Sequence, residues 1–172
     1  RGFGTACNRG VAIAEGHYIL ILNPDTIVHD GALAGMVRFM DAHPSAGACG
    51  PRLQNPDGTQ QRSARRFPTV FHELMEMSGL AAAFPHTRLN HYLIPQWDHK
   101  GTRAVDFVIG ACLCLRRDAL ETVEHVFDEH FFMFYEETDL CRRLHDESWT
   151  VWFVDDSSVT HVGGTSYRDS VG

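Results

Sequence analysis

The sequence predicts an α/β domain, in which short buried strands alternate with amphipathic helices. Two observations carry this prediction. Apolar runs rich in β-forming residues are too short for helices and end abruptly, which is typical of buried strands. The segments between them carry apolar residues at helical spacing. A chain of 172 residues is long enough for one hydrophobic core and too short to expect two, so residues 1–172 should form a single domain.

The amino-terminal part of the chain shows this alternation first. Residues 3–15 carry apolar side chains at helical spacing, and Gly16 follows as the expected C′ glycine of a helix. Residues 18–22 form a continuous apolar run, which predicts a strand buried on both faces of a parallel sheet. This strand ends at the Asn-Pro-Asp sequence of residues 23–25, because proline cannot continue a central strand.

The rest of the chain continues the pattern. In order, we expect a helix capped by Asp30 and ending before Pro44, a turn over residues 55–58, a helix over 69–82, a loop over 84–101, a strand over 105–115 interrupted by Gly110, a helix over 138–145, a strand over 149–154 and a closing segment of small and polar residues.

The net charge limits the kinds of partner. A formal charge of −7 gives the whole molecule no electrostatic footprint for nucleic acid. An anionic substrate would have to be met by local cations or by a metal ion. Arg62, Arg65 and Arg66 form a basic cluster that could hold a diphosphate through charge-assisted hydrogen bonds. The alternative is that these arginines belong to an ordinary solvated surface.

The cysteines and apolar runs indicate a reduced, intracellular protein. Five cysteines lack the spacing of a disulfide scaffold or a zinc ribbon. Cys112 and Cys114 lie two positions apart in an apolar run, so on a strand they would share a face and act as small buried hydrophobes. No apolar run approaches the roughly 18 residues that a membrane helix needs.

Asp25 is the first candidate for chemistry. It lies three residues past Leu22, the last residue of a predicted strand. In open α/β sheets, ligands bind beyond the carboxyl ends of the strands. A carboxylate there suits a hard divalent cation and the phosphates bound to it. The alternative is a turn aspartate that follows a proline.

The second candidate is an aromatic segment that leads directly into three acids. Residues 131–135 have the sequence Phe-Phe-Met-Phe-Tyr, and Glu136, Glu137 and Asp139 follow. Like charges beside apolar surface repel one another and resist desolvation, so at least one pKa should rise, which suits a general base near neutrality. The alternative is that these acids enrich the first turn of the following helix, where its dipole favours them, a role that suits Asp139.

His161 is a third candidate, because it follows an apolar strand and precedes two glycines. Neutral imidazole is a suitable ligand, beside carboxylates, for a transition-type cation. A single histidine among eleven is more often structural, so this assignment depends on the other candidates.

Together these candidates belong to a longer series of short motifs. The series is Gly2-Phe3, Asn8-x-Gly10, Ala14-x-Gly16, Leu22-Asn23-Pro24-Asp25, Gly50-Pro51, Asp57-Gly58, Gly110-Ala111, Phe127-Asp128-Glu129, Phe131-Phe132-Met133, Glu136-Glu137-x-Asp139-Leu140-Cys141-x-Arg143 and His161. Its order and spacing resemble family 2 glycosyltransferases over nearly the whole chain, and most closely the rhamnosyltransferase-like branch that builds bacterial surface polysaccharides. The resemblance implies a GT-A-type, Rossmann-like mixed sheet flanked by helices. It also implies sugar transfer from a nucleotide diphosphate donor with inversion at the anomeric carbon.

The resemblance implies a metal site at the end of the first strand. Asn23 and Asp25 fall where the family binds the donor diphosphate, and Asn23 replaces the first aspartate of the family's Asp-x-Asp motif. Asp25 would hold Mg²⁺ or Mn²⁺, and His161 falls on the family's late histidine, a further contact to the metal.

The resemblance also implies an acceptor site and a catalytic base. Gly110, Ala111 and Asp139 fall in the acceptor-binding segments. The family's base is the second acid of a Glu-Asp pair, and here that position is Glu137, one methylene longer, after Glu136. We expect Glu137 to be the base and Glu136 to be the reserve.

The implied partners are a nucleotide-sugar donor, with dTDP-rhamnose suggested by the branch, and a saccharide or lipid-linked acceptor. The implied location is the cytoplasm, at the inner face of the plasma membrane. The family's first strands and base-recognition segment are absent before Arg1, so we expect a sheet that lacks its first strands and a chain that binds donor poorly by itself. The alternative is a non-catalytic remnant or binding module of a larger glycosyltransferase. A metal-dependent phosphohydrolase would want a second acid where Ile27 stands.

Overall fold

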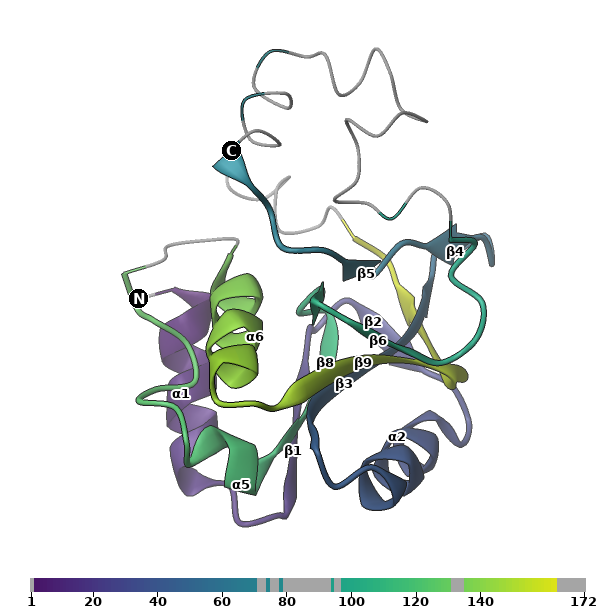
Figure 1. Ribbon diagram of the computed structural model, residues 1–172. Coiled ribbons are helices and arrows are strands. Elements are labelled where there is room, and N and C mark those ends of the chain that lie inside the picture. Colours follow the sequence, from purple (N-terminus) through teal and green to yellow (C-terminus); the bar gives the residue numbers. More distant parts are fainter. Residues whose placement is uncertain are drawn as a thin grey trace.

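The computed structural model describes residues 2–70, 74, 78, 94, 97–130 and 135–163. Within these residues the elements are α1 (Phe3–Ile13), β1 (Tyr18–Leu22), β2 (Thr26–Val28), α2 (Ala32–Ala42), β3 (Ala46–Gln54), β4 (Gln60–Gln61), β5 (Ala64–Arg65), β6 (Arg103–Val105), β7 (Phe107–Val108), β8 (Cys112–Arg116), α5 (Arg117–Leu120), α6 (Glu136–Asp146) and β9 (Thr150–His161). Helices α1, α5 and α6 pack on one face of a mixed sheet and α2 packs on the other (Figure 1). This is the predicted α/β class.

The sheet combines one parallel pair with antiparallel neighbours. Its order is β1-β8-β3-β9-β2, with β4 paired to β3 and β6 paired to β9. Strands β3 and β9 run parallel, whereas the other pairs of this sheet are antiparallel. Strands β5 and β7 form a separate antiparallel pair. Strands β1 and β2 are the first and last strands in this order. The segment 23–25 that joins them therefore runs along the edge of the sheet where β1 ends.

The strand predicted over residues 18–22 has the right extent, but its predicted environment is wrong. β1 pairs antiparallel with β8 and does not lie inside a parallel sheet. Its side chains alternate: Ile19 and Ile21 are buried, whereas Leu20 and Leu22 are 37% and 39% exposed. A continuous apolar run does not reveal this difference, because each strand presents alternate residues to opposite faces whether or not both faces are covered.

The central strand β3 is not predicted by the sequence, because it contains glycine and proline, which are depleted in strands. Packing explains the two glycines. A Cβ on Gly47 would lie 2.8 Å from the Cβ of Trp149, and a Cβ on Gly50 would lie 2.9 Å from Cγ2 of Val108. Larger side chains would therefore force the neighbouring elements away from the centre of the sheet.

Two predicted helix caps are wrong. The C-cap of α1 is Ala14 in an extended conformation, and Gly16 does not have the left-handed backbone expected of a C′ glycine. The N-cap of α2 is Gly31, with φ of 77°, and not Asp30. A left-handed residue is needed at position 31, and glycine adopts that conformation without the steric cost of a side chain.

The cysteine prediction is confirmed. Cys112 and Cys114 lie in the same buried cluster, and Cys49 of β3 stands opposite Cys114 in the register. All three are free thiols. Burial raises the pKa of Cys112 to about 12, so this thiol stays protonated and packs as a small apolar side chain.

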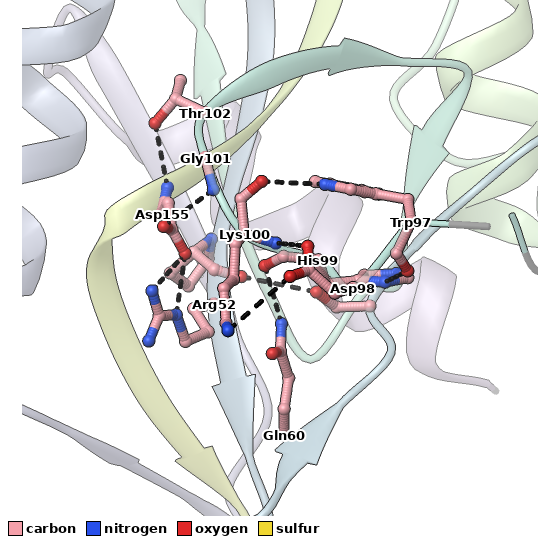
Figure 2. A network of polar contacts seen from close by, with 11 residues as sticks. Arg52, Gln60, Trp97, Asp98, His99, Lys100, Gly101, Thr102 and Asp155 are labelled. Atoms are coloured by element: carbon pink, nitrogen blue, oxygen red, sulfur yellow. Dashed lines mark hydrogen bonds and ion pairs between the residues drawn. The ribbon is translucent and has the colours of Figure 1, made fainter. Parts of the chain in front are cut away.

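The segment 97–102 is tied to the central sheet by polar contacts (Figure 2). Asp155 of β9 forms an ion pair with Arg52 of β3 and also accepts the backbone N–H of Gly101 at 2.8 Å. From β4, the side chain of Gln60 donates to a carbonyl oxygen of the same segment at 2.9 Å. These polar contacts therefore hold the segment 97–102 against the parallel pair β3–β9.

Several predictions concern residues outside the described part. Most of the helix expected over 69–82, most of the loop over 84–101 and the aromatic residues 131–134 lie there. Among the residues that the structure describes, no helix has the length and apolar character needed to cross a membrane.

Candidate active site

The end of β1 lies against the segment that precedes β8. The backbone N–H of Asn23 donates to the carbonyl oxygen of Ala111 at 3.0 Å. This bond continues the β1–β8 ladder by one residue, so it places the Asn-Pro-Asp loop beside Gly110 and Ala111. The two segments for which the family resemblance implies donor and acceptor binding are therefore neighbours at one edge of the sheet.

Glu137 reaches the same edge from α6. It lies in the first turn of the helix, and its Oε1 accepts the backbone N–H of Gly110 at 3.3 Å. A Cβ built on Gly110 would lie 3.7 Å from Cδ and 3.8 Å from Oε2 of Glu137, which is ordinary contact. The absence of a side chain at position 110 thus leaves the carboxylate of Glu137 uncovered on this side.

Glu136 has a different environment. Its side chain is 3% exposed, and burial is the main cause of its raised pKa, with the charge of Glu137 as a further cause. It also lies close enough to Cys7 of α1 to raise the pKa of that thiol, which burial raises most. The prediction that one acid of the cluster has a raised pKa is confirmed for Glu136. The acid in contact with the edge, however, is Glu137.

Asp139 is held by a neighbour on its own helix. Its Oδ2 accepts a hydrogen bond from Nε of Arg143 at 2.8 Å and forms an ion pair with Nη2 at 2.8 Å. Arg143 also donates to the carbonyl oxygens of His125 and Val126. Asp139 thereby helps to anchor α6 to the segment beneath it. The same residue borders an open pocket of about 220 Å³, lined by Phe67, Pro68, Tyr135, Thr138, Asp139 and Arg142.

Asp25 and His161 come together from the ends of two paired strands. Oδ1 of Asp25 lies 3.5 Å from Nε2 of His161, and each side chain is 15% exposed. The pairing of β2 with β9 sets this distance, because Thr26 stands opposite His161 and the N–H of Val162 donates to the carbonyl of Asp25 at 2.9 Å. The two predicted metal ligands are therefore adjacent.

This pair fits a divalent cation. Oxygen and nitrogen ligands bind such ions at roughly 2.0–2.2 Å, so two donor atoms 3.5 Å apart can share one ion. The other ring nitrogen of His161, Nδ1, lies 2.8 Å from Oε1 of Gln61, which leaves Nε2 facing Asp25. Within the described residues, no group of three or more His, Cys, Asp or Glu side chains could hold a metal. Water or substrate oxygens would have to complete the coordination at this pair.

The three arginines occupy different positions. Arg62 is exposed and lies close enough to His99 to affect its pKa, whereas Arg65 is half-buried on β5 opposite Phe107 of β7. Arg66 is exposed. Their role as phosphate contacts stays a prediction.

Gln61 is the contact that sequence reasoning missed. It belongs to the two-residue strand β4, and the register of β4 against β3 carries its side chain to His161. A pair of glutamines after a turn has no distinctive spacing. Only the turn signal over residues 55–58, which the structure confirms, indicates that the chain reverses direction here.

Comparisons with known proteins identify the family of the chain. Residues 1–124 match the sequence profile of glycosyl transferase family 2. Two curated relatives, the N-acetylglucosaminyl-diphospho-decaprenol L-rhamnosyltransferases of Mycobacterium tuberculosis strains CDC 1551 and H37Rv, are each 30% identical over 171 residues. The match covers 93% of this chain and 55% of each relative, so the chain spans about half the length of the curated relatives it matches.

The fold also has a solved counterpart. The crystal structure of GalNAc-T7 with UDP, GalNAc and Mn²⁺ matches with a TM-score of 0.66 at 12% identity, covering 94% of this chain and 30% of that chain. At this identity the likeness concerns the fold alone. The mixed sheet flanked by helices is thus a GT-A-type arrangement, as the sequence predicts.

Proposed function

The chain belongs to glycosyltransferase family 2, and on this premise we propose that it transfers a sugar from a nucleoside diphosphate donor to a hydroxyl group of a saccharide or lipid-linked acceptor, with inversion at the anomeric carbon. One observation supports the proposal above the others. The carboxylate of Glu137, the Asp25–His161 pair and the Gly110–Ala111 segment lie at the edge of the sheet where β1 ends. The contacts that join them are Glu137 to Gly110, Asn23 to Ala111, and Asp25 to His161.

The donor diphosphate would bind at the end of β1. Asp25 and His161 would hold Mg²⁺ or Mn²⁺, which when bound offsets the negative charge that develops on the leaving diphosphate. Asn23, two residues before Asp25, contributes an uncharged amide where a second carboxylate would repel the phosphates. The protein's net charge of −7 makes such a local attraction necessary for an anionic donor.

Glu137 is the proposed base. Its Oε1 accepts the N–H of Gly110 at 3.3 Å, and this contact orients the carboxylate toward the Gly110–Ala111 segment. Oε2 would then accept the proton of the acceptor hydroxyl as its oxygen attacks the anomeric carbon from the face opposite the diphosphate. The pKa of Glu136 is raised, as would suit a base, but its side chain is buried, so an acceptor hydroxyl would have less access to it than to Glu137.

The proposed substrates follow from the relatives. The two mycobacterial relatives are named as L-rhamnosyltransferases that act on N-acetylglucosaminyl-diphospho-decaprenol. We extend this to an activated rhamnose, dTDP-rhamnose, as donor and a lipid-linked saccharide as acceptor. Such an acceptor would place the enzyme at the inner face of the plasma membrane.

The test, made on the full-length protein, is release of nucleoside diphosphate from a panel of UDP-, dTDP- and GDP-sugars, with Mg²⁺ or Mn²⁺ and with saccharide and lipid-linked acceptors. Asp25→Ala is the test variant. Asp118→Ala is its matched control, because Asp118 is an exposed aspartate on α5, outside the edge that holds the candidate site. We expect metal-dependent release that Asp25→Ala loses and Asp118→Ala keeps. No release from any donor would instead support a non-catalytic remnant.

A further inference from the structure

A line of side-chain hydrogen bonds runs from the turn between β3 and β4 to His161. Oγ1 of Thr59 donates to Oδ1 of Asp57 at 2.6 Å, and Nδ2 of Asn55 donates to Oγ1 of Thr59 at 2.9 Å. Nε2 of Gln61 donates to Oδ1 of Asn55 at 3.1 Å. Oε1 of Gln61 lies 2.8 Å from Nδ1 of His161. These five side chains, which we name the turn relay, end at one of the two candidate metal ligands.

The direction of every bond in the turn relay follows from its first member. Hydrogen bonds from the hydroxyl and backbone N–H of Thr59 lower the pKa of Asp57, so near neutrality this carboxylate is ionised and can only accept. The hydroxyl of Thr59 therefore donates its single proton to Asp57. The hydroxyl oxygen accepts a hydrogen bond from the amide nitrogen of Asn55.

The same reasoning fixes the two amides and the imidazole. With its nitrogen directed at Thr59, Asn55 turns its oxygen toward Gln61, which must present its own nitrogen there. The oxygen of Gln61 then faces His161 and requires a proton on Nδ1. A histidine must be neutral to bind a cation, and in that form a proton on Nδ1 leaves Nε2 with a lone pair on the side of Asp25.

We propose that Gln61 is a positioning residue, which holds the imidazole of His161 in the Nδ1-protonated form and presents Nε2, together with Oδ1 of Asp25, to a divalent cation. The proposal rests on the metal pair of the proposed function and adds a residue to it. In other metal sites, such partners fix the tautomer and the ring orientation of a ligating histidine, and losing one typically costs about 10–100-fold in metal affinity.

The chain provides a matched control in the neighbouring residue. Gln60 also donates a side-chain hydrogen bond of 2.9 Å, but to the carbonyl of His99 (Figure 2). Gln60→Leu removes this one contact, whereas Gln61→Leu removes the contacts of the neighbouring amide with Asn55 and His161. Only the second change removes the acceptor that faces His161.

Two readouts test the proposal on the native protein and on Gln61→Leu, Gln61→Glu and Gln60→Leu. The first is the tautomer of His161 without metal, from its ring ¹⁵N chemical shifts at mildly alkaline pH. The second is the affinity for Mn²⁺ alone, from the electron paramagnetic resonance signal of the free ion. Thermal unfolding of each variant shows whether it is folded under both sets of conditions.

In the native protein and in Gln60→Leu we expect His161 protonated on Nδ1 and the same Mn²⁺ affinity. Gln61→Leu should lose the preference for Nδ1 and bind Mn²⁺ about 10–100-fold more weakly. Gln61→Glu keeps an oxygen acceptor toward His161 and should restore both properties. Asn55→Leu, which releases the amide of Gln61 to rotate, should shift both readouts in the same direction as Gln61→Leu.

Different failures separate the two ideas. If Gln61→Leu is folded and binds Mn²⁺ as tightly as the native protein, or if native His161 is protonated on Nε2, the role of Gln61 is wrong while the metal pair stands. If the native protein binds no Mn²⁺, the metal pair of the proposed function is wrong, and the role of Gln61 is lost with it.

Discussion

Gly110 and Glu137 meet across the edge of the sheet, where the backbone N–H of Gly110 donates to Oε1 of the glutamate at 3.3 Å. The contact joins the segment before β8 to the first turn of α6. A base that is held by one oxygen keeps the other available to an acceptor hydroxyl. In the proposed function, this hydrogen bond would position the side chain of Glu137 as the base.

Gly110→Ala should impair transfer without harming the fold. The added Cβ would meet nothing closer than 3.7 Å, and Gly110 does not have a left-handed backbone that would strain alanine. The methyl group would, however, lie 3.8 Å from Oε2 of Glu137, in the space proposed for the acceptor. We expect kcat/KM for acceptor to fall about tenfold, equivalent to about 1.4 kcal/mol, with the Tm unchanged.

Gly10→Ala is the control for this change. Gly10 lies in α1 and a Cβ there would meet nothing within 4 Å, so alanine should leave transfer intact and stabilise the helix by about 0.5–1 kcal/mol. Equal kinetics for Gly110→Ala and the native enzyme would show that the acceptor does not approach Gly110.

Removing either member of the Asp25–His161 pair should weaken metal binding. Asp25→Asn removes the negative charge of one ligand and His161→Ala removes the other ligand, so Mn²⁺ affinity should fall at least about tenfold, measured by titration calorimetry with UDP present. His29→Ala is the control, since His29 contacts Thr160 on β9 at 2.8 Å, in a nearby exposed position. A loss of affinity in His29→Ala as large as that in His161→Ala would contradict the assignment.

His99 should make stability depend on pH. It is 1% exposed, its ring stacks on Trp97 with centroids 4.3 Å apart, and burial lowers its pKa below the ordinary 6.5. As pH falls below 6.5, the unfolded chain takes up this proton before the folded protein does. The stability that His99 contributes is therefore complete above pH 6.5 and is lost as pH falls toward the lower folded pKa.

Chemical unfolding of the native protein and of His99→Phe over this pH range measures the effect. The free energy of unfolding of the native protein should decrease relative to that of His99→Phe as pH falls, because phenylalanine keeps the stacking and does not titrate. Parallel curves would show that His99 does not titrate differently in the two states.

Asp155 should contribute to stability through the contacts in Figure 2. Its carboxylate accepts hydrogen bonds from Nε of Arg52 and from the backbone N–H of Gly101, each at 2.8 Å, and its side chain is 17% exposed. Asp155→Ala would leave both donors without this acceptor, so the free energy of unfolding should fall by about 1–3 kcal/mol. Asp156→Ala, at the exposed neighbouring position, should change it little, and equal effects of the two would contradict the role of the network.

The sequence predicts the residue types of the site better than their environments. Asp25 and His161 are both identifiable from their positions after apolar strands, and the structure makes them adjacent. What brings them together is the pairing of Thr26 with His161, which no local pattern reveals. The acid pair can likewise be recognised in the sequence. Which of Glu136 and Glu137 is available as a base, however, depends on where α6 begins and on which side chain faces α1.

The unpredicted parts have a common physical cause. β3 cannot be recognised in the sequence, because glycine is unfavourable in strands. Gly47 and Gly50 are required there by close packing against side chains from distant segments. Gln61 is hidden because β4 has only two residues and acquires its position from β3. Helical spacing, by contrast, is a local property, which is why α1 and α6 are predicted almost to their ends.

The most direct measurement of the central claim is the rate of sugar transfer by Glu137→Gln, compared with Glu136→Gln and the native enzyme. Glutamine keeps the size of the side chain and an oxygen for the N–H of Gly110, but it cannot take the acceptor proton. We predict that kcat falls about 10²–10⁴-fold in Glu137→Gln, with unchanged Tm and Mn²⁺ affinity, and falls far less in Glu136→Gln. Full transfer by Glu137→Gln would contradict the assignment of Glu137 as the base.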